Sequence, residues 1–476
     1  MLFPTLEFAL FFVIVFVANW LLRPHDLAWK LAMLAASLFF YGWWNPRFVL
    51  LLGGSIVANW FFGDLVERAH HDGQVARASM TVKAAVATNL AVLGVFKYYG
   101  FFTEQFRSSF GALGELIPLV EITLPVGISF FTFQALSYVV DIHRRHIQPL
   151  SLLDVGVYLS FFPQLVAGPI VRASEFAPQL LTHPDPRSVP TAEAFRLIFA
   201  GLFKKVVIST FLASAIVDEV FNLPDAYSGA EVLFAVYAYA IQIYADFSGY
   251  TDIAIGVALL MGFRFPQNFD APYRALSIQD FWRRWHMTLS NWLRDYLYIP
   301  LGGNRRGTLF TYRNLFLTML LGGLWHGAAW NFVVWGAIHG GVLAAERFVS
   351  TIWLRRVEGP VLPEALSKAL RWLYTFHVVC LAWIFFRAET FEIATSMIGR
   401  ILGWAAGPSP LVTTLLVLTI VLMLVSQFVP APVVDGLQLE FSRLSWVWQG
   451  VALGFAIVLV DVLGPEGVAP FIYFQF

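Results

Sequence analysis

One histidine, His326, lies inside an apolar segment, where an ionisable side chain is energetically costly. It belongs to LLGGLWHGAAWNFVVWGAIHG, residues 320–340, whose other residues are mostly apolar or glycine. Ionisable groups in such segments are candidates for function. An imidazole, with an ordinary pKa of about 6.5, can accept a proton near neutral pH or act as a nucleophile. We therefore interpret His326 as a candidate base or nucleophile; a structural histidine bonded to a neighbouring carbonyl is the alternative.

The neighbours of His326 follow from treating residues 320–340 as one helix. Trp330 then shares the face of His326, and Trp325 precedes it, so both tryptophans are expected to shape the space around the imidazole. His339 lies thirteen residues further on, which is about 220° around the helix. We expect the two histidines to point away from each other. This spacing argues against a metal pair, and we predict no metal site.

A second histidine, His286, lies in the most polar segment of the chain, residues 264–307. A capping-box variant at Ser277 predicts the start of a helix. Its tryptophans would lie on one face, Arg283 and Arg284 on the other, and His286 at the border. A helix of this kind lies in the membrane interface. The two arginines are interpreted as ligands for phosphate groups or, alternatively, as anchors for lipid headgroups.

Polar residues also interrupt an apolar segment at residues 242–256, QIYADFSGYTDIAIG. They include Asp246, Ser248 and Tyr250, and Gly249 is expected to permit a break in the helix. Three interpretations stay open: a sodium or proton site at an unwound helix, the wall of a polar cavity, or a helix end that emerges into water.

The elements that must position these residues are membrane-spanning helices. Of the 476 residues, 58% are hydrophobic and 13% charged, whereas soluble proteins average roughly 45–50% and about 25%. Such a composition predicts an all-α polytopic membrane protein with about eleven transmembrane helices plus re-entrant or interfacial helices. Thirteen apolar segments occur near residues 5–22, 29–44, 48–63, 82–99, 124–142, 152–168, 193–221, 230–262, 309–321, 324–346, 371–387, 411–430 and 446–463.

Charge and cysteine content limit what the chain can do and how it is oriented. Lys and Arg total 31 and Asp and Glu total 31, so no electrostatic argument supports nucleic-acid binding. The single cysteine, Cys380, excludes a disulfide framework and a Cys-based zinc site. Alternate short loops are basic, which predicts an N-terminus outside the membrane and these loops in the cytoplasm. The basic loops contain Arg23, Lys30, Arg68, Arg77, Lys83, Arg144 and Arg145.

Several ordered motifs resemble one family. FWRRWHMTLSNWLRDYLYIPLGGNRRG, which contains His286, is followed by YRNLFLTMLLGGLWHGA, which contains His326. LPVGISFFTFQALSYVVD, FFPQLVAGPI and DFSGYTDIAIG occur at 124–141, 161–170 and 246–256. Together they resemble the membrane-bound O-acyltransferase family, in its bacterial alginate O-acetyltransferase branch, over roughly residues 1–400.

The resemblance implies a fold and an activity. Family members form one membrane-embedded domain, here 1–476 with a catalytic core of roughly 120–345, whose helices surround a funnel and a central tunnel. An acyl donor, acetyl-CoA in this branch, enters from the cytoplasm. The acetyl group passes to an exported polysaccharide with the help of an extracytoplasmic acetyltransferase-like partner. The protein would lie in the bacterial inner membrane and hold no tightly bound cofactor.

The resemblance also implies roles for single residues. The essential histidine of the family corresponds to His326, and its second histidine to His286. Candidates for the tunnel wall or the donor mouth are Asp246, Ser248, Tyr250, Trp325, Trp330, Arg283 and Arg284. His326 can act as a base or carry the acyl group covalently. Two other functions stay open: D-alanyl transfer from a carrier protein to teichoic acid, and a transporter or scaffold without catalysis.

Overall fold

The computed structural model describes residues 1–111, 118, 120, 122–353 and 362–464. Within these ranges all regular elements are helices, as the sequence predicts. The helices group into two compact units, Met1–Ile198 with Ile253–Pro266, and Phe199–Asp252 with Gln267–Phe476. The single domain predicted over 1–476 stays a prediction.

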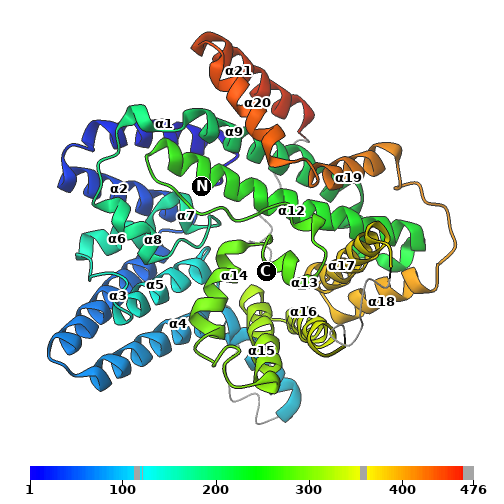
Figure 1. The fold of residues 1–476 in the computed structure, drawn as a ribbon, viewed down its shortest axis with the longest axis horizontal. Coiled ribbons are helices and arrows are strands. Elements are labelled where there is room, and N and C mark those ends of the chain that lie inside the picture. Colours follow the sequence, from blue (N-terminus) through cyan, green and yellow to red (C-terminus); the bar gives the residue numbers. More distant parts are fainter. Residues whose placement is uncertain (112–117, 119, 121, 354–361, 465–476) are drawn as a thin grey trace. The chain divides into compact units, whose positions relative to one another are not determined.

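The first unit contains helices from the N-terminal part of the chain. In it, α3 packs against both α2 and α4 (Figure 1). The buried side-chain amides of Asn59 and Asn89 donate to each other, over 3.2 and 2.8 Å, and so join α3 to α4. The helices are α1 (Leu6–Leu22), α2 (Asp26–Gly42), α3 (Arg47–His71), α4 (Val75–Phe110), α5 (Ile128–His143), α6 (Leu152–Ser160), α7 (Phe162–Leu165), α8 (Ala173–Leu180) and the start of α9 (Thr191–Leu202).

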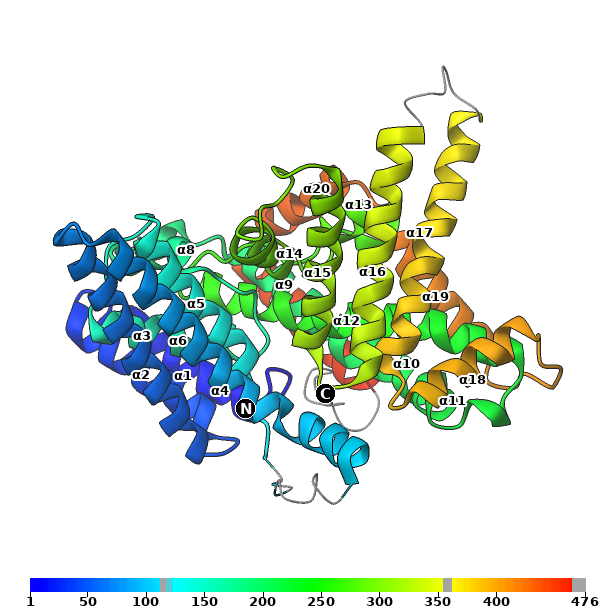
Figure 2. The ribbon, with the colours of Figure 1, turned by 90° about the horizontal axis from the view of Figure 1, so that it is seen from below.

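The second unit contains both histidines of interest. In Figure 2, α15 and α16 run antiparallel and side by side, with α17 beside α16. Its helices are α10 (Thr210–Leu212), α11 (Asp218–Asn222), most of α12 (Gly229–Leu260), α13 (Ile278–Trp282), α14 (Met287–Leu293), α15 (Thr308–His326), α16 (Trp330–Phe348), α17 (Glu364–Arg387), α18 (Phe391–Leu402), α19 (Thr414–Ser426), α20 (Ala431–Arg443) and α21 (Trp446–Leu463). Short π-helices are η3 (Phe203–Ser209), η4 (Ala213–Val217), η7 (Arg294–Tyr298) and η8 (Val349–Trp353).

The hairpin of α15 and α16 corrects the prediction of one helix over residues 320–340. The first helix ends at His326 and the second begins at Trp330, with extended backbone at Gly327 between them. Glycines let the two helices approach closely. A Cβ atom at Gly323 would lie 2.2 Å from the Phe332 carbonyl oxygen, and one at Gly336 would lie 2.5 Å from that of Met319. The glycines of this segment therefore form a packing seam.

Helix α12 is continuous, so the break predicted at Gly249 is wrong. Gly249 serves instead as a contact point, because a Cβ atom there would lie 2.7 Å from the Gly201 carbonyl oxygen. This close approach brings α12 against the segment that carries Lys204 and Lys205, whose side chains then reach α12.

The membrane-spanning character of the chain is visible in the length of its helices. Six helical segments among the described residues are long and apolar enough to cross a membrane, and the predicted count of eleven is not confirmed. Three shorter apolar helices span Leu6–Leu22, Thr414–Ser426 and Val447–Leu463. The six candidates are Arg47–His71, Val75–Phe110, Thr191–Asn222, Gly229–Leu260, Trp330–Thr351 and Glu364–Arg387.

Candidate functional site

The segment around His286 is not the continuous helix predicted from Ser277 onward. Helix α13 ends at Trp282 and α14 begins at Met287. His286 directly precedes α14 and has a φ angle of 41°, in the left-handed region. The assignment of tryptophans and arginines to two faces of one helix therefore does not hold.

Asn268 explains the break. In a continuous helix, the N–H groups of Met287 and Thr288 would donate to carbonyls four residues earlier. Here the Met287 N–H donates to the Asn268 backbone carbonyl over 2.9 Å, and the Thr288 N–H donates to the Asn268 side-chain oxygen over 3.2 Å. The acceptor of both bonds, Asn268, lies outside the predicted helix, so helical periodicity could not reveal them.

The same asparagine determines the tautomer of His286. A backbone N–H can only donate, so the Thr288 contact identifies the Asn268 atom concerned as the carbonyl oxygen. This oxygen lies 3.1 Å from Nδ1 of His286, which must therefore carry a proton and donate. The lone pair of a neutral imidazole is then on Nε2. That atom is buried and has no hydrogen-bond partner among the residues that the structure describes.

Burial also controls the charge of His286. The side chain is fully buried, and its ring lies edge-on to Phe247 at 4.7 Å between centroids. Loss of water disfavours the imidazolium and lowers the pKa of His286 below its ordinary value. At pH 7 the ring is therefore neutral, and its Nε2 lone pair is available to accept a proton or to attack an electrophile.

His326 lies in the same cluster of rings. It is the last residue of α15 and is 3% exposed. Its ring centroid lies 4.9 Å from that of Trp325, 4.9 Å from that of Trp335 and 5.1 Å from that of Phe386. Trp325 is also 6.2 Å from the His286 ring. The structure thus gives the two predicted histidines one common contact partner, Trp325.

The helix breaks after His326, so the expectations that Trp330 shares its helical face and that His339 points away from it do not hold. Trp330 begins α16 and is 56% exposed, whereas Trp325 and Trp335 both lie edge-on to His326. His339 does not point away, since its ring lies 4.7 Å from the same Trp335. Two antiparallel helices place both histidines against one indole, which a single helix could not do.

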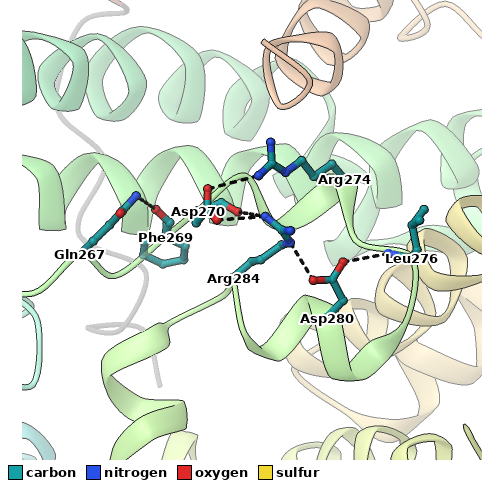
Figure 3. A network of polar contacts seen from close by, with 7 residues as sticks. All are labelled: Gln267, Phe269, Asp270, Arg274, Leu276, Asp280 and Arg284. Carbon is teal, nitrogen blue, oxygen red and sulfur yellow. Dashed lines mark hydrogen bonds and ion pairs between the residues drawn. The ribbon is translucent and has the colours of Figure 1, made fainter. Parts of the chain in front are cut away.

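The two arginines differ from each other. Arg284 forms ion pairs with Asp280 at 2.9 Å and with Asp270 at 3.0 Å (Figure 3). Two carboxylates already neutralise its guanidinium, which argues against the predicted role as a phosphate ligand. Arg283 is exposed, and both of its predicted roles, phosphate ligand and headgroup anchor, stay predictions. In Figure 3, Arg274 also approaches Asp270, so this network anchors Asp270, which lies two residues after Asn268.

The polar residues of α12 face lysines that the sequence analysis missed. Asp246 is buried and paired with Lys205, and it also accepts from Ser209 over 3.1 Å. Lys204 donates to Ser248 over 2.9 Å and to Asp252 over 2.6 Å. An aspartate already paired with a lysine disfavours a sodium site there. Two adjacent lysines inside the apolar segment 193–221 were the available signal.

Tyr250 is fully buried in α12. That Tyr250, Asp246 and Ser248 line a tunnel stays a prediction. In the part of the chain that the structure describes, no group of three or more His, Cys, Asp or Glu side chains could hold a metal ion.

The sequence of the whole segment around this site matches one family. A model of the membrane-bound O-acyltransferase family matches residues 86–386, which is well over half of the chain. The chain belongs to this family. It is therefore a multi-pass membrane acyltransferase, and both histidines lie within the matched range.

Relatives with assigned functions extend the likeness over most of the chain. A probable alginate O-acetylase AlgI of Pseudomonas aeruginosa is 41% identical over 399 residues, 83% of this chain and 74% of that protein. The corresponding Pseudomonas putida protein is 37% identical over 473 residues, 94% of each chain. A peptidoglycan O-acetyltransferase of Helicobacter pylori is 39% identical over 403 residues, 79% of this chain and 74% of that protein.

Proposed function

We propose that this acyltransferase moves an acetyl group from cytoplasmic acetyl-CoA, through a tunnel in the membrane, to an exported polysaccharide. An extracytoplasmic acetyltransferase-like partner completes the transfer. The protein lies in the bacterial inner membrane with its N-terminus outside. Alginate and peptidoglycan, the acceptors named for the relatives, both carry sugar hydroxyls, which supports a carbohydrate acceptor.

The observation that supports this function best is the pair of buried imidazoles beside Trp325. Acyl transfer from a thioester to a hydroxyl requires a group that accepts the hydroxyl proton. In our proposal His326 accepts the proton of the acceptor hydroxyl while the oxygen of that hydroxyl attacks the carbonyl carbon of the thioester donor. The C–S bond then breaks, and the proton passes to the departing sulfur. His286, through its Nε2 lone pair, orients or activates the donor.

Donor phosphates would be bound by Arg283, since Arg284 is already paired with two carboxylates. Replacing Arg283 by Gln is therefore expected to raise the KM for acetyl-CoA. If Arg283 instead anchors lipid headgroups, the same replacement should lower the amount of inserted protein and leave KM unchanged.

The function is tested with inner-membrane vesicles that contain the protein, supplied with acetyl-labelled acetyl-CoA. We expect release of free CoA and the appearance of label in base-labile O-esters, both dependent on the protein. Consumption of a D-alanyl carrier protein without use of acetyl-CoA would identify the teichoic acid reaction instead. Consumption of neither donor, with the protein inserted and folded, would indicate a transporter or scaffold.

A further inference from the structure

His339 is a third buried histidine in the cluster, and the function proposed above does not use it. It lies in α16 and is fully buried. Its ring stacks on Phe281 at 6.1 Å and lies edge-on to Trp282 at 5.2 Å and to Trp335 at 4.7 Å. Trp335 in turn contacts His326 at 4.9 Å. Only one indole therefore separates His339 from the candidate base.

Trp282 determines which nitrogen of His339 carries the proton. An indole N–H can only donate, and that of Trp282 lies 3.3 Å from Nδ1 of His339. Nδ1 must therefore be the unprotonated acceptor, and the proton of a neutral ring is on Nε2. This is the opposite tautomer to that of His286, whose Nδ1 donates to Asn268.

The Nε2–H group of His339 has no acceptor in the part of the chain that the structure describes. The atom is buried and without a hydrogen-bond partner among the described residues, and the same holds for Nε1 of Trp335. Buried donors are almost always satisfied, because leaving one unpaired costs free energy. Trp335 contacts both His339 and His326, so the two unsatisfied N–H donors belong to the ring cluster that contains His326. They indicate that the acceptor is supplied by something that binds in this cluster.

We propose that Nε2–H of His339 donates a hydrogen bond to the carbonyl oxygen of the acyl group during transfer. This inference rests on the proposed function and extends it. When the hydroxyl oxygen adds to the thioester carbon, an electron pair moves onto the carbonyl oxygen. When the C–S bond breaks, that pair returns and sulfur leaves. His339 keeps its proton throughout and stabilises the intermediate negative charge.

The test compares two variants of His339 in the full-length protein, in vesicles supplied with acetyl-CoA. His339→Leu removes the donor, and we expect kcat to fall about 10²–10³-fold with little change in KM, as for the loss of one oxyanion donor. His339→Gln restores a side-chain N–H and should recover at least a tenth of the wild-type kcat. The control His377→Leu replaces an exposed histidine of α17 and should leave kcat unchanged.

The pH profile separates a hydrogen-bond donor from a base. In the proposed role His339 keeps its proton. His339→Gln should therefore leave the acidic limb of the pH profile of kcat/KM at the same pH as in the wild type. A shifted limb would overturn the proposal and assign proton transfer to His339. Wild-type kcat in a folded His339→Leu protein, or equal losses in the Leu and Gln variants, would also overturn it.

A second variant covers the case in which His339→Leu fails to fold. Trp282→Phe removes the hydrogen bond to Nδ1 but retains His339 and an aromatic ring. The ring of His339 can then adopt the other tautomer, so kcat should fall severalfold at unchanged KM. An unchanged kcat would contradict the proposal. If the wild-type protein itself uses no acetyl-CoA, the proposed function fails, whereas an active wild type with unaffected variants rejects only the role of His339.

Discussion

At the scale of single residues, the side-chain oxygen of Asn268 decides which nitrogen of His286 can react. It accepts from the Thr288 backbone and from Nδ1 of His286, at 3.2 and 3.1 Å. Nε2 is thereby left with its lone pair, in a site that disfavours positive charge. Activity that depends on His286 should therefore respond to the chemistry of residue 268.

Replacing Asn268 by Asp should shift the pH dependence of the reaction. Burial lowers the pKa of His286 in the wild type. The acidic limb of the wild-type pH profile of kcat/KM should therefore lie below about pH 6.5. A carboxylate at position 268 stabilises the imidazolium, raises the pKa of His286 and moves the limb to higher pH. Asn268→Leu, which adds no charge, should lower kcat without moving the limb upward. Identical limbs in all three proteins would show that Asn268 does not control His286.

His286 and His326 could be found from the sequence, but their partners could not. His326 stands out because a titratable group is rare among apolar residues, and His286 because it lies in the most polar segment of the chain; ordered motifs surround both. Asn268 lies eighteen residues before His286, and its role depends on a turn that periodicity reads as helix. His339 appeared to point away because the helix break at Gly327 was not recognised.

At the scale of elements, α15 and α16 hold the cluster together through their glycine seam. The seam sets the distance between His326, at the end of one helix, and Trp335, near the start of the next. A helix pair packed at backbone distance has no room for added atoms. The geometry of the site should therefore be sensitive to single methyl groups in the seam.

Gly336→Ala should destabilise the protein by about 1–3 kcal/mol and reduce activity. Its new Cβ atom would lie 2.5 Å from the Met319 carbonyl oxygen, so the helices must separate. Gly341→Ala is the matched control on the same helix, since a Cβ atom there meets nothing within 4 Å. Thermal unfolding and acetyl transfer should both be affected in the first variant and not in the second. Equal behaviour of the two would argue against a packing seam.

The buried pair of Lys205 and Asp246 joins the segment after α9 to α12. Lys205→Met leaves a buried carboxylate without this partner, which should cost about 3–5 kcal/mol of stability. The double variant with Asp246→Leu removes both charges and should regain most of that loss. A double-mutant cycle on thermal unfolding measures the coupling. Additive losses would show that the pair does not act as a unit.

Sequence patterns predicted helices well and their ends poorly. Apolar length identified the long helices, because about 20 residues must cross a bilayer whatever their neighbours are. Gly249 was read as a break, although it is the point where the backbone of another helix approaches. One continuous helix from Ser277 onward was predicted from local patterns, but hydrogen bonds that Met287 and Thr288 donate to Asn268 interrupt it. Contacts between distant segments decide such cases.

At the scale of the whole molecule, the alternation of basic loops predicts the orientation, and hence the direction of acetyl transfer. In a Cys380→Ala protein, a cysteine at position 110 should react with an impermeant thiol reagent in intact cells. A cysteine at position 75 should react only after permeabilisation. Val75 and Phe110 are both exposed, at 63% and 56%, so the reagent can reach either side chain. Reversed labelling would contradict the orientation and require transfer in the opposite direction.

The central claim is that the buried histidines beside Trp325 carry out acyl transfer, and His326→Ala tests it most directly. Transfer of label from acetyl-CoA to O-esters should be measured in vesicles with matched amounts of folded protein. We predict a loss of about 10²–10⁴-fold for His326→Ala, as expected for a general base, a smaller loss for His286→Ala, and none for the exposed His377→Ala. A folded His326→Ala protein with near wild-type transfer would contradict the catalytic assignment.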